Sequence, residues 1–273
     1  MKSIYALFLV LLLPCSLVYP TLTTLFGTND HEIKTAIKNL IATGKTVKIA
    51  FNDFFHENEQ AILQKIKTKY GISDYKWKKT FQHAHNLVHA DPLYTQTDII
   101  NHQPDDHPFI KEARELIALY GMNPQCVHVH NVQNTTLAQV VTHIVDDSYL
   151  THSLDLNISG LAKLDNDERI LTLKHEIRHL WYADSVYTIL IDYLMNYNFS
   201  DPLYIAFSKN QELRADIMAA TDSVEDAHAL YKWLASFIPD DTDDFIHPTQ
   251  NERLEAAKQL YTYLTLEQEY LSV

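Results

Sequence analysis

Apolar residues recur at helical spacing through the first part of the chain. From Ile33 onward they fall three or four positions apart, which places them on one face of a helix. Asn29 and Asp30 can cap the first turn of this helix, and Gly44 is a natural end for it. The pattern recurs in two further segments, residues 57–70 before Gly71 and residues 108–121, where Pro108 suits the first helical position.

Downstream of Cys126 the pattern changes to the alternation that is typical of strands. Apolar and polar residues alternate from Val127 to His130, and again over Ser153–Ile158. An alternation of period two gives a strand one buried and one exposed face. We therefore expect two strands of a small sheet in this region.

Capping patterns predict the helices in the rest of the chain. Asp165 followed by Glu168 opens a long, mostly apolar segment, which we predict to be one buried helix. The same kind of start is found at two further places, Ser208 with Gln211 and Thr249 with Glu252. Together with the two strands, these segments predict a helix-rich α+β fold.

Residues 1–20 have the layout of a secretory signal. Lys2 precedes an apolar run from Ile4 to Leu13, which is short for a full membrane span. We expect export to the periplasm or the extracellular space, with membrane association only through this segment; an uncleaved N-terminal anchor is the alternative. If the segment is removed, Cys126 is the only cysteine, and no internal disulfide can form.

The polar stretch His102–Pro108 predicts a boundary between an accessory helical region, residues 21–105, and a main domain, residues 106–273.

Composition and charge restrict the partners of the remaining chain. The 35 acidic residues outnumber the 22 basic ones, which gives a formal net charge of -13, and no Lys/Arg-dense face stands out. We therefore expect no nucleic acid partner. The five glycines also argue against Gly-rich phosphate loops.

His175, Glu176 and His179 lie within the long helix predicted after Asp165. Residues four apart on a helix share one face, so both imidazoles can reach a single ion. Glu176 lies beside them, close enough to hydrogen-bond a water on that ion without being a ligand. A catalytic zinc ion needs three protein ligands and one open position, so a third donor has to come from elsewhere in the fold.

Glu212 and Asp216 can complete this site. They are four residues apart in the helix predicted from Ser208, so one face offers two carboxylates. Glu212 is the candidate third ligand. Asp216 would accept the other ring N–H of a ligating histidine and so fix its tautomer. The alternative for both residues is a solvated acidic face.

These motifs resemble those of the HtpX and CAAX prenyl protease family of gluzincin metallopeptidases. The resemblance rests on three motifs: His175–His179, Glu212 with Ala215 and Asp216, and His247-Pro248 with Glu252-Arg253. It extends upstream through Ile117–Gly121, Gly160-Leu161 and Glu168, and covers residues 108–260. Arg178 differs, because related motifs usually hold a small or apolar residue at this position.

The resemblance implies a zincin fold with a small sheet over the motif helix, so that residues 106–273 form a metallopeptidase domain. It implies one zinc ion per chain, held by His175, His179 and Glu212, and endopeptidase activity with Glu176 as the general base. Substrates in the family are often membrane or envelope proteins, and the chain resembles the soluble, exported members.

His247 and Arg253 are further candidates for a catalytic role. In the family, the position of His247 lies near the metal, where it would stabilise the oxyanion or occupy the open zinc position as a gate. A helix-capping or packing role is the alternative. Arg253 is a second candidate for contacting the oxyanion or the substrate carbonyl, against the alternative of pairing with an acidic neighbour.

Other histidine pairs lack the remaining parts of such a site. His85 and His89 are also four apart, but Asn86 stands where the base would be. His128 and His130 share one face of a predicted strand, so we expect them at the surface or lining a cleft. A second metal site is therefore not expected.

The sequence thus predicts a zinc-dependent endopeptidase that acts on envelope or extracellular proteins. We expect an extended protein or peptide substrate along the exposed edge of the strand over Ser153–Ile158. The alternative is a non-catalytic or latent zinc-stabilised module that holds client proteins.

Overall fold

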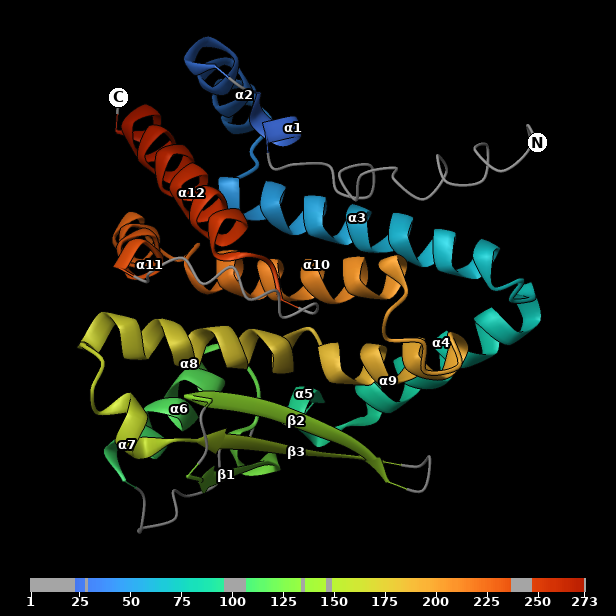
Figure 1. Ribbon diagram of the computed structural model, residues 1–273. Helices are drawn as coiled ribbons and strands as arrows, with labels where there is room; N and C mark the ends of the chain where they lie inside the picture. Colours follow the sequence, from blue (N-terminus) through green and yellow to red (C-terminus); the bar gives the residue numbers. More distant parts are fainter. Residues whose placement is uncertain are drawn as a thin grey trace, which may run out of the picture.

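The computed structural model describes residues 23–27, 29–95, 107–133, 136–145, 149–236 and 247–272. The predicted signal segment, most of the boundary His102–Pro108 and the acidic stretch Asp240–Asp244 lie outside these ranges. Helices form most of the described chain, and a small sheet lies on one side of them (Figure 1). The predicted helix-rich α+β class is confirmed. Within the described ranges, no helix combines the length and apolar content that a bilayer span requires.

The helices fall into two groups, one before and one after the strands. The first group is α1 (Thr23–Phe26), α2 (Asp30–Ala42), α3 (Val47–Lys69), α4 (Asp74–Ala90), α5 (Pro92–Thr95) and α6 (Pro108–Leu119). The strands are β1 (Val127–Asn131), β2 (Ala138–Val145) and β3 (Tyr149–Leu156). The second group is α7 (Ile158–Leu161), α8 (Asn166–Trp181), α9 (Asp184–Leu194), α10 (Pro202–Ala219), α11 (Val224–Ser236) and α12 (Gln250–Leu271).

The middle strand of the sheet is β3. The strand order is β1–β3–β2, in which β1 pairs with β3 in parallel and β2 pairs with β3 antiparallel. The prediction that the strand over Ser153–Ile158 forms an exposed edge is therefore wrong, because this strand is β3 and has a neighbour on each side. The edge strand beside the helices is β2, a segment that was not predicted to be a strand. Ile158, predicted as the last residue of the middle strand, belongs to α7.

The helix α8 lies between the sheet and α10, and α3 lies on the far side of α10 (Figure 1). Leu154 of β3 and Ile177 of α8 belong to one hydrophobic core. A second core joins α3, α10 and α12 through Phe51, Ile217 and Tyr263. Helices from both ends of the chain thus pack around α10.

Capping residues set the starts of several helices as predicted. The capping boxes that begin at Asp165 and Thr249 are present, and Asn29 caps α2 through its side chain. The helix α6 begins with Pro108 and is followed by Gly121 at φ +77°.

Two helices begin earlier than predicted. The helix α10 starts at Pro202 after the N-cap Asp201. Ser208 and Gln211, which were expected at its start, are buried within the helix. The helix α3 starts after the N-cap Thr46, well before residue 57. In α10, the polar residues that resembled a cap in the sequence face the inside of the molecule.

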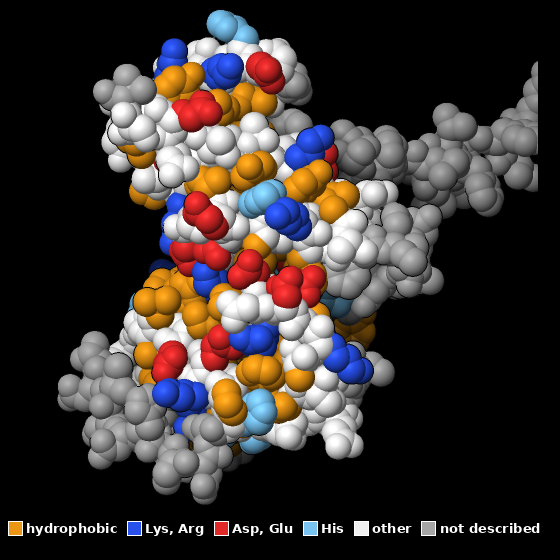
Figure 2. All heavy atoms as spheres, turned by 90° about the vertical axis from the view of Figure 1, so that its left-hand side faces the viewer, with side chains coloured by type: hydrophobic (Ala, Val, Ile, Leu, Met, Phe, Trp, Pro, Cys, Tyr) orange, Lys and Arg blue, Asp and Glu red, His pale blue; other side chains and the backbone are white. Residues whose placement is uncertain are grey.

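Charged side chains of both signs are mixed on the face shown in Figure 2, with small groups of hydrophobic side chains between them. This face carries no continuous basic surface.

Candidate metal centre

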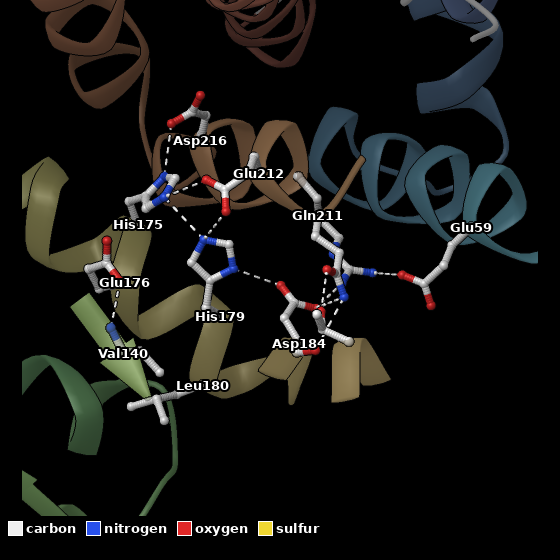
Figure 3. Close-up of polar contacts among 12 residues, drawn as sticks. Glu59, Val140, His175, Glu176, His179, Leu180, Asp184, Gln211, Glu212 and Asp216 are labelled. Carbon is white, nitrogen blue, oxygen red and sulfur yellow. Dashed lines mark hydrogen bonds and ion pairs between the residues drawn. The ribbon is translucent and has the colours of Figure 1, made fainter. Parts of the chain in front are cut away.

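Three donor side chains from two helices face one point (Figure 3). His175 and His179 lie one turn apart on α8, and Glu212 lies opposite them on α10. Their donor atoms all lie within 4.8 Å of one another. The structure therefore brings together the three residues that the sequence predicts as ligands.

The distances between the donor atoms fit a zinc ion. The Nε2 atoms of His175 and His179 are 3.1 Å apart. Glu212 places Oε2 3.4 Å from the first nitrogen and Oε1 3.5 Å from the second. Donors about 2.1 Å from a tetrahedral ion lie about 3.4 Å from one another. Each oxygen of Glu212 thus lies near one imidazole, and the three residues could supply three of the four ligands of a zinc ion.

Asp216 orients His175. Its Oδ1 lies 2.8 Å from His175 Nδ1, which leaves Nε2 of the imidazole facing the other donors. Arg253 donates two hydrogen bonds of 2.7 Å to the two oxygens of Asp216. Burial by itself raises the pKa of Asp216, but the Arg253 guanidinium and His175 lower it to about 2. Arg253 thus pairs with an acidic neighbour, and it also lines the cleft described below.

His179 has a carboxylate partner of its own, Asp184, which sequence reasoning missed. Asp184 Oδ2 lies 2.8 Å from His179 Nδ1. The helix α8 ends at Trp181, and Ala183 turns the chain with φ +53°, so that Asp184 begins α9 close to His179. An acidic residue just after the motif helix was the available signal.

A buried arginine from α10 holds Asp184 in turn. Arg214 donates to Asp184 Oδ1, and its second terminal nitrogen donates to Glu59 Oε2 at 2.7 Å. The guanidinium carbon lies 4.2 Å from the centre of the Tyr182 ring. Glu59 belongs to α3, so a helix from the first part of the chain reaches the candidate metal centre through Arg214 and Asp184.

Glu176 lies beside the two histidines and accepts a hydrogen bond from the sheet (Figure 3). Its Oε2 accepts the backbone N–H of Val140 on β2 at 2.9 Å. Burial raises the pKa of Glu176, although the neighbouring imidazoles His175 and His179 oppose this effect. The carboxylate is therefore oriented by the edge strand and suited to taking up a proton.

The carboxylates around the two imidazoles create a negative site. Burial alone lowers the pKa of His175, but its hydrogen bonds to Asp216 and Glu212 raise it to about 9. The pKa of His179 is also raised well above its ordinary value, because Glu212 and Asp184 outweigh burial. A site that stabilises cationic imidazoles in this way also favours a bound cation.

The three donors open into a cleft of about 730 Å³. Its walls include β2, α8, α9 and α10, and Glu176 and Arg253 also line it. His247 is at its rim, with a side chain that is 49% exposed and an Nε2 atom 3.7 Å from Glu212 Oε2. The cap of α12 is Thr249. The exposure of His247 and the cap at Thr249 argue against a packing or capping role for His247.

Arg178, the charged residue within the motif, lies on another face of α8. Its guanidinium carbon is 3.9 Å from the centre of the Tyr120 ring, and one of its nitrogens is 3.5 Å from Asp222. Arg178 is itself buried. The extra charge is therefore neutralised away from the three donors.

The other histidine pairs lie elsewhere. His85 and His89 face each other on α4 with ring centres 3.9 Å apart, while His128 and His130 are exposed on β1. Across the described ranges, the His, Cys, Asp and Glu side chains that converge closely enough to hold one metal ion are His175, His179 and Glu212.

No protein-family model, curated protein or solved structure matches this chain.

Proposed function

We propose that this chain is a zinc-dependent endopeptidase with a zincin fold, similar to the soluble, exported members of the HtpX and CAAX prenyl protease family. One observation carries the proposal: His175, His179 and Glu212 converge at zinc-site distances, and Glu176 lies beside them in the same cleft. The small sheet packed against α8 agrees with a zincin arrangement. When bound, zinc supplies Lewis-acid chemistry, which lowers the pKa of water to about 7 and polarises a carbonyl.

The residues of the chain divide the remaining tasks. Asp216 and Asp184 orient the two imidazoles that hold the ion. Glu176 takes a proton from the attacking water and delivers it to the leaving amine, since burial brings its pKa closer to the working pH. His247, at the rim, is the candidate for contacting the oxyanion or for gating the cleft.

An extended substrate would lie along β2. This strand forms a wall of the cleft, and Val140 turns its N–H away from β3 towards Glu176. Backbone groups of an antiparallel strand face its two sides alternately. Those of Thr142 and Ile144 therefore also face away from β3, where an added substrate strand could pair with them.

The substitution Glu176→Gln tests the proposal. The purified variant should still bind one zinc ion per chain, but its kcat on casein or a fluorogenic peptide should fall by a factor of about one hundred or more. Glu255→Gln, on the exposed surface of α12, is the matched control and should keep full turnover. Undiminished cleavage by the Glu176 variant, or a wild-type protein that binds no zinc, would refute the proposal.

A second candidate function is a latent or non-catalytic module that holds client proteins. The observation that favours it is His247 at the rim, because an imidazole 3.7 Å from Glu212 is near enough to act as a fourth donor in a closed site. Such a module would bind zinc and unfolded proteins. It would show no proteolysis that a chelator inhibits. Cleavage by His247→Ala but not by the wild type would identify a latent peptidase.

A further inference from the structure

A second groove continues from the catalytic cleft along the edge strand. It has a volume of about 680 Å³ and is lined by residues of α4, β2 and α9. Ile189 of α9 lines both spaces, and Ile144 of β2 lines the second groove directly after His143, which lines the first. One strand edge therefore runs from Glu176 into this groove.

The groove has a basic and aromatic lining. Lys76 and Lys79 line it together with His83, and all three are exposed on α4. The Lys76 ammonium lies 5.0 Å from the centre of the Tyr193 ring on α9. Among the described residues that line the groove there is no carboxylate. A basic groove is a distinctive feature on a chain of net charge -13.

Exposed tyrosines complete the groove. Tyr193 is 53% exposed and Tyr197 is 60% exposed, and both line it. Asn196 and Tyr197 have φ angles of +55° and +58°, a conformation that residues other than glycine rarely adopt. This sharp turn after α9 keeps the Tyr197 ring at the edge of the groove, where it can contact a bound chain.

We propose that this groove binds an acidic, extended segment of the protein substrate, about four residues from the bond that is cleaved. The inference rests on the proposed peptidase function and specifies its substrate class. Val140 and Ile144 are four residues apart, which corresponds to about 13 Å of strand. A substrate strand paired with β2 therefore places side chains at this distance from Glu176 beside the lysines.

The chemistry of the lining selects this occupant. Carboxylates of the segment pair with Lys76 and Lys79, and its apolar atoms pack on the tyrosine rings. The strand edge supplies backbone hydrogen bonds, which hold the peptide regardless of its sequence, so the lysines determine the preference for acidic residues.

Three peptides of equal length test the proposal: one neutral, one with three glutamates N-terminal to the cleaved bond, and one with the glutamates C-terminal to it. For the wild-type protein loaded with zinc, kcat/KM for one of the acidic peptides should exceed that for the neutral peptide on the order of tenfold at low salt. The excess should shrink in 0.5 M NaCl, because the pairs are exposed.

The double variant Lys76→Ala/Lys79→Ala should lose this preference. Lys34→Ala/Lys258→Ala is the matched control: it removes the same charge from exposed positions on α2 and α12, which lie at the other end of the molecule from α4 (Figure 1). The control should retain the wild-type ratio. Equal ratios in the wild type and the α4 variant would overturn the proposal.

A binding measurement separates failure of this inference from failure of the peptidase proposal. Fluorescence anisotropy of a labelled acidic peptide should show binding to Glu176→Gln protein, with a loss on the order of tenfold when Lys76 and Lys79 are also replaced. Such binding without cleavage by the wild type would refute the peptidase and keep the acidic-peptide groove. Lysine-dependent binding of anionic phosphatidylserine vesicles, with no preference for acidic peptides, would identify a membrane contact and overturn the inference.

Discussion

Replacing Arg214 with methionine removes a buried cation that lies between two buried carboxylates. Arg214 is 5% exposed, Glu59 is 7% exposed and Asp184 is 4% exposed. A hydrogen bond to a charged group contributes about 1.5–3 kcal/mol, and removing one partner of a buried ion pair costs about 3–5 kcal/mol. We therefore expect the free energy of unfolding to fall by about 4 kcal/mol, a large share of the stability of a typical domain.

A double-mutant cycle with Glu59→Gln checks the physical reason for this loss. In the wild-type background, Glu59→Gln should cost about 1.5–3 kcal/mol, because it removes the charge that pairs with Arg214. In the Arg214→Met background, Glu59→Gln should cost almost nothing, because the Glu59 charge has already lost its buried partner. The coupling free energy should accordingly be about 1.5–3 kcal/mol.

Urea unfolding, followed by circular dichroism and tryptophan fluorescence, measures these free energies. EDTA in all samples keeps zinc binding out of the comparison. Arg169→Met is the control, because Arg169 pairs with Glu112 at a more exposed place, with side chains 15% and 25% exposed, and should cost at most about 1 kcal/mol. A cost of Arg214→Met no larger than that of the control, or strictly additive effects of the two substitutions, would refute the reasoning.

Three further predictions concern the orientation of the ligands, the start of α10 and the rim of the cleft. Asp216→Asn should weaken zinc binding about ten- to hundredfold, measured by competition with a chromophoric chelator, because His175 loses the carboxylate that orients it; an unchanged affinity would contradict this role. Burial raises the pKa of Asp201, but Lys69 and Tyr70 lower it below its ordinary value. The charge of Asp201 should therefore stabilise the protein above the unfolded-state pKa and cease to do so as the pH falls through the folded-state pKa. Thermal unfolding should show Asp201→Asn to be less stable than the wild type at pH 7 and nearly equal to it at strongly acidic pH, and an equal gap at both pH values would exclude this explanation. His247→Ala should raise kcat if His247 gates the cleft and lower it if His247 contacts the oxyanion, whereas an unchanged kcat would discard both roles.

Local patterns in the sequence were sufficient for several features of the fold and the candidate site. The four-residue spacing of His175 and His179 on a helix places both rings on one side, whatever surrounds the helix. The same spacing pairs Glu212 with Asp216. Capping boxes marked the starts of α8 and α12, because a cap is satisfied within a few residues of the chain.

Features that depend on packing could not be predicted in this way. The sequence of β2 contains a run of β-branched residues, yet only its pairing with β3 makes it the edge strand that contacts Glu176. Ser208 with Gln211 resembled the start of a helix. The local pattern does not show that Ser208 is buried inside α10.

The sequence by itself determined which side chains share a helix face, and so which residues could bind a metal ion, because helix geometry is repeated in every turn. Only the tertiary structure decided that α8 and α10 meet at zinc-site distances, and that Glu59 supports the centre through Arg214 and Asp184. These contacts join residues far apart in the chain, and their formation depends on how the cores of the whole molecule pack.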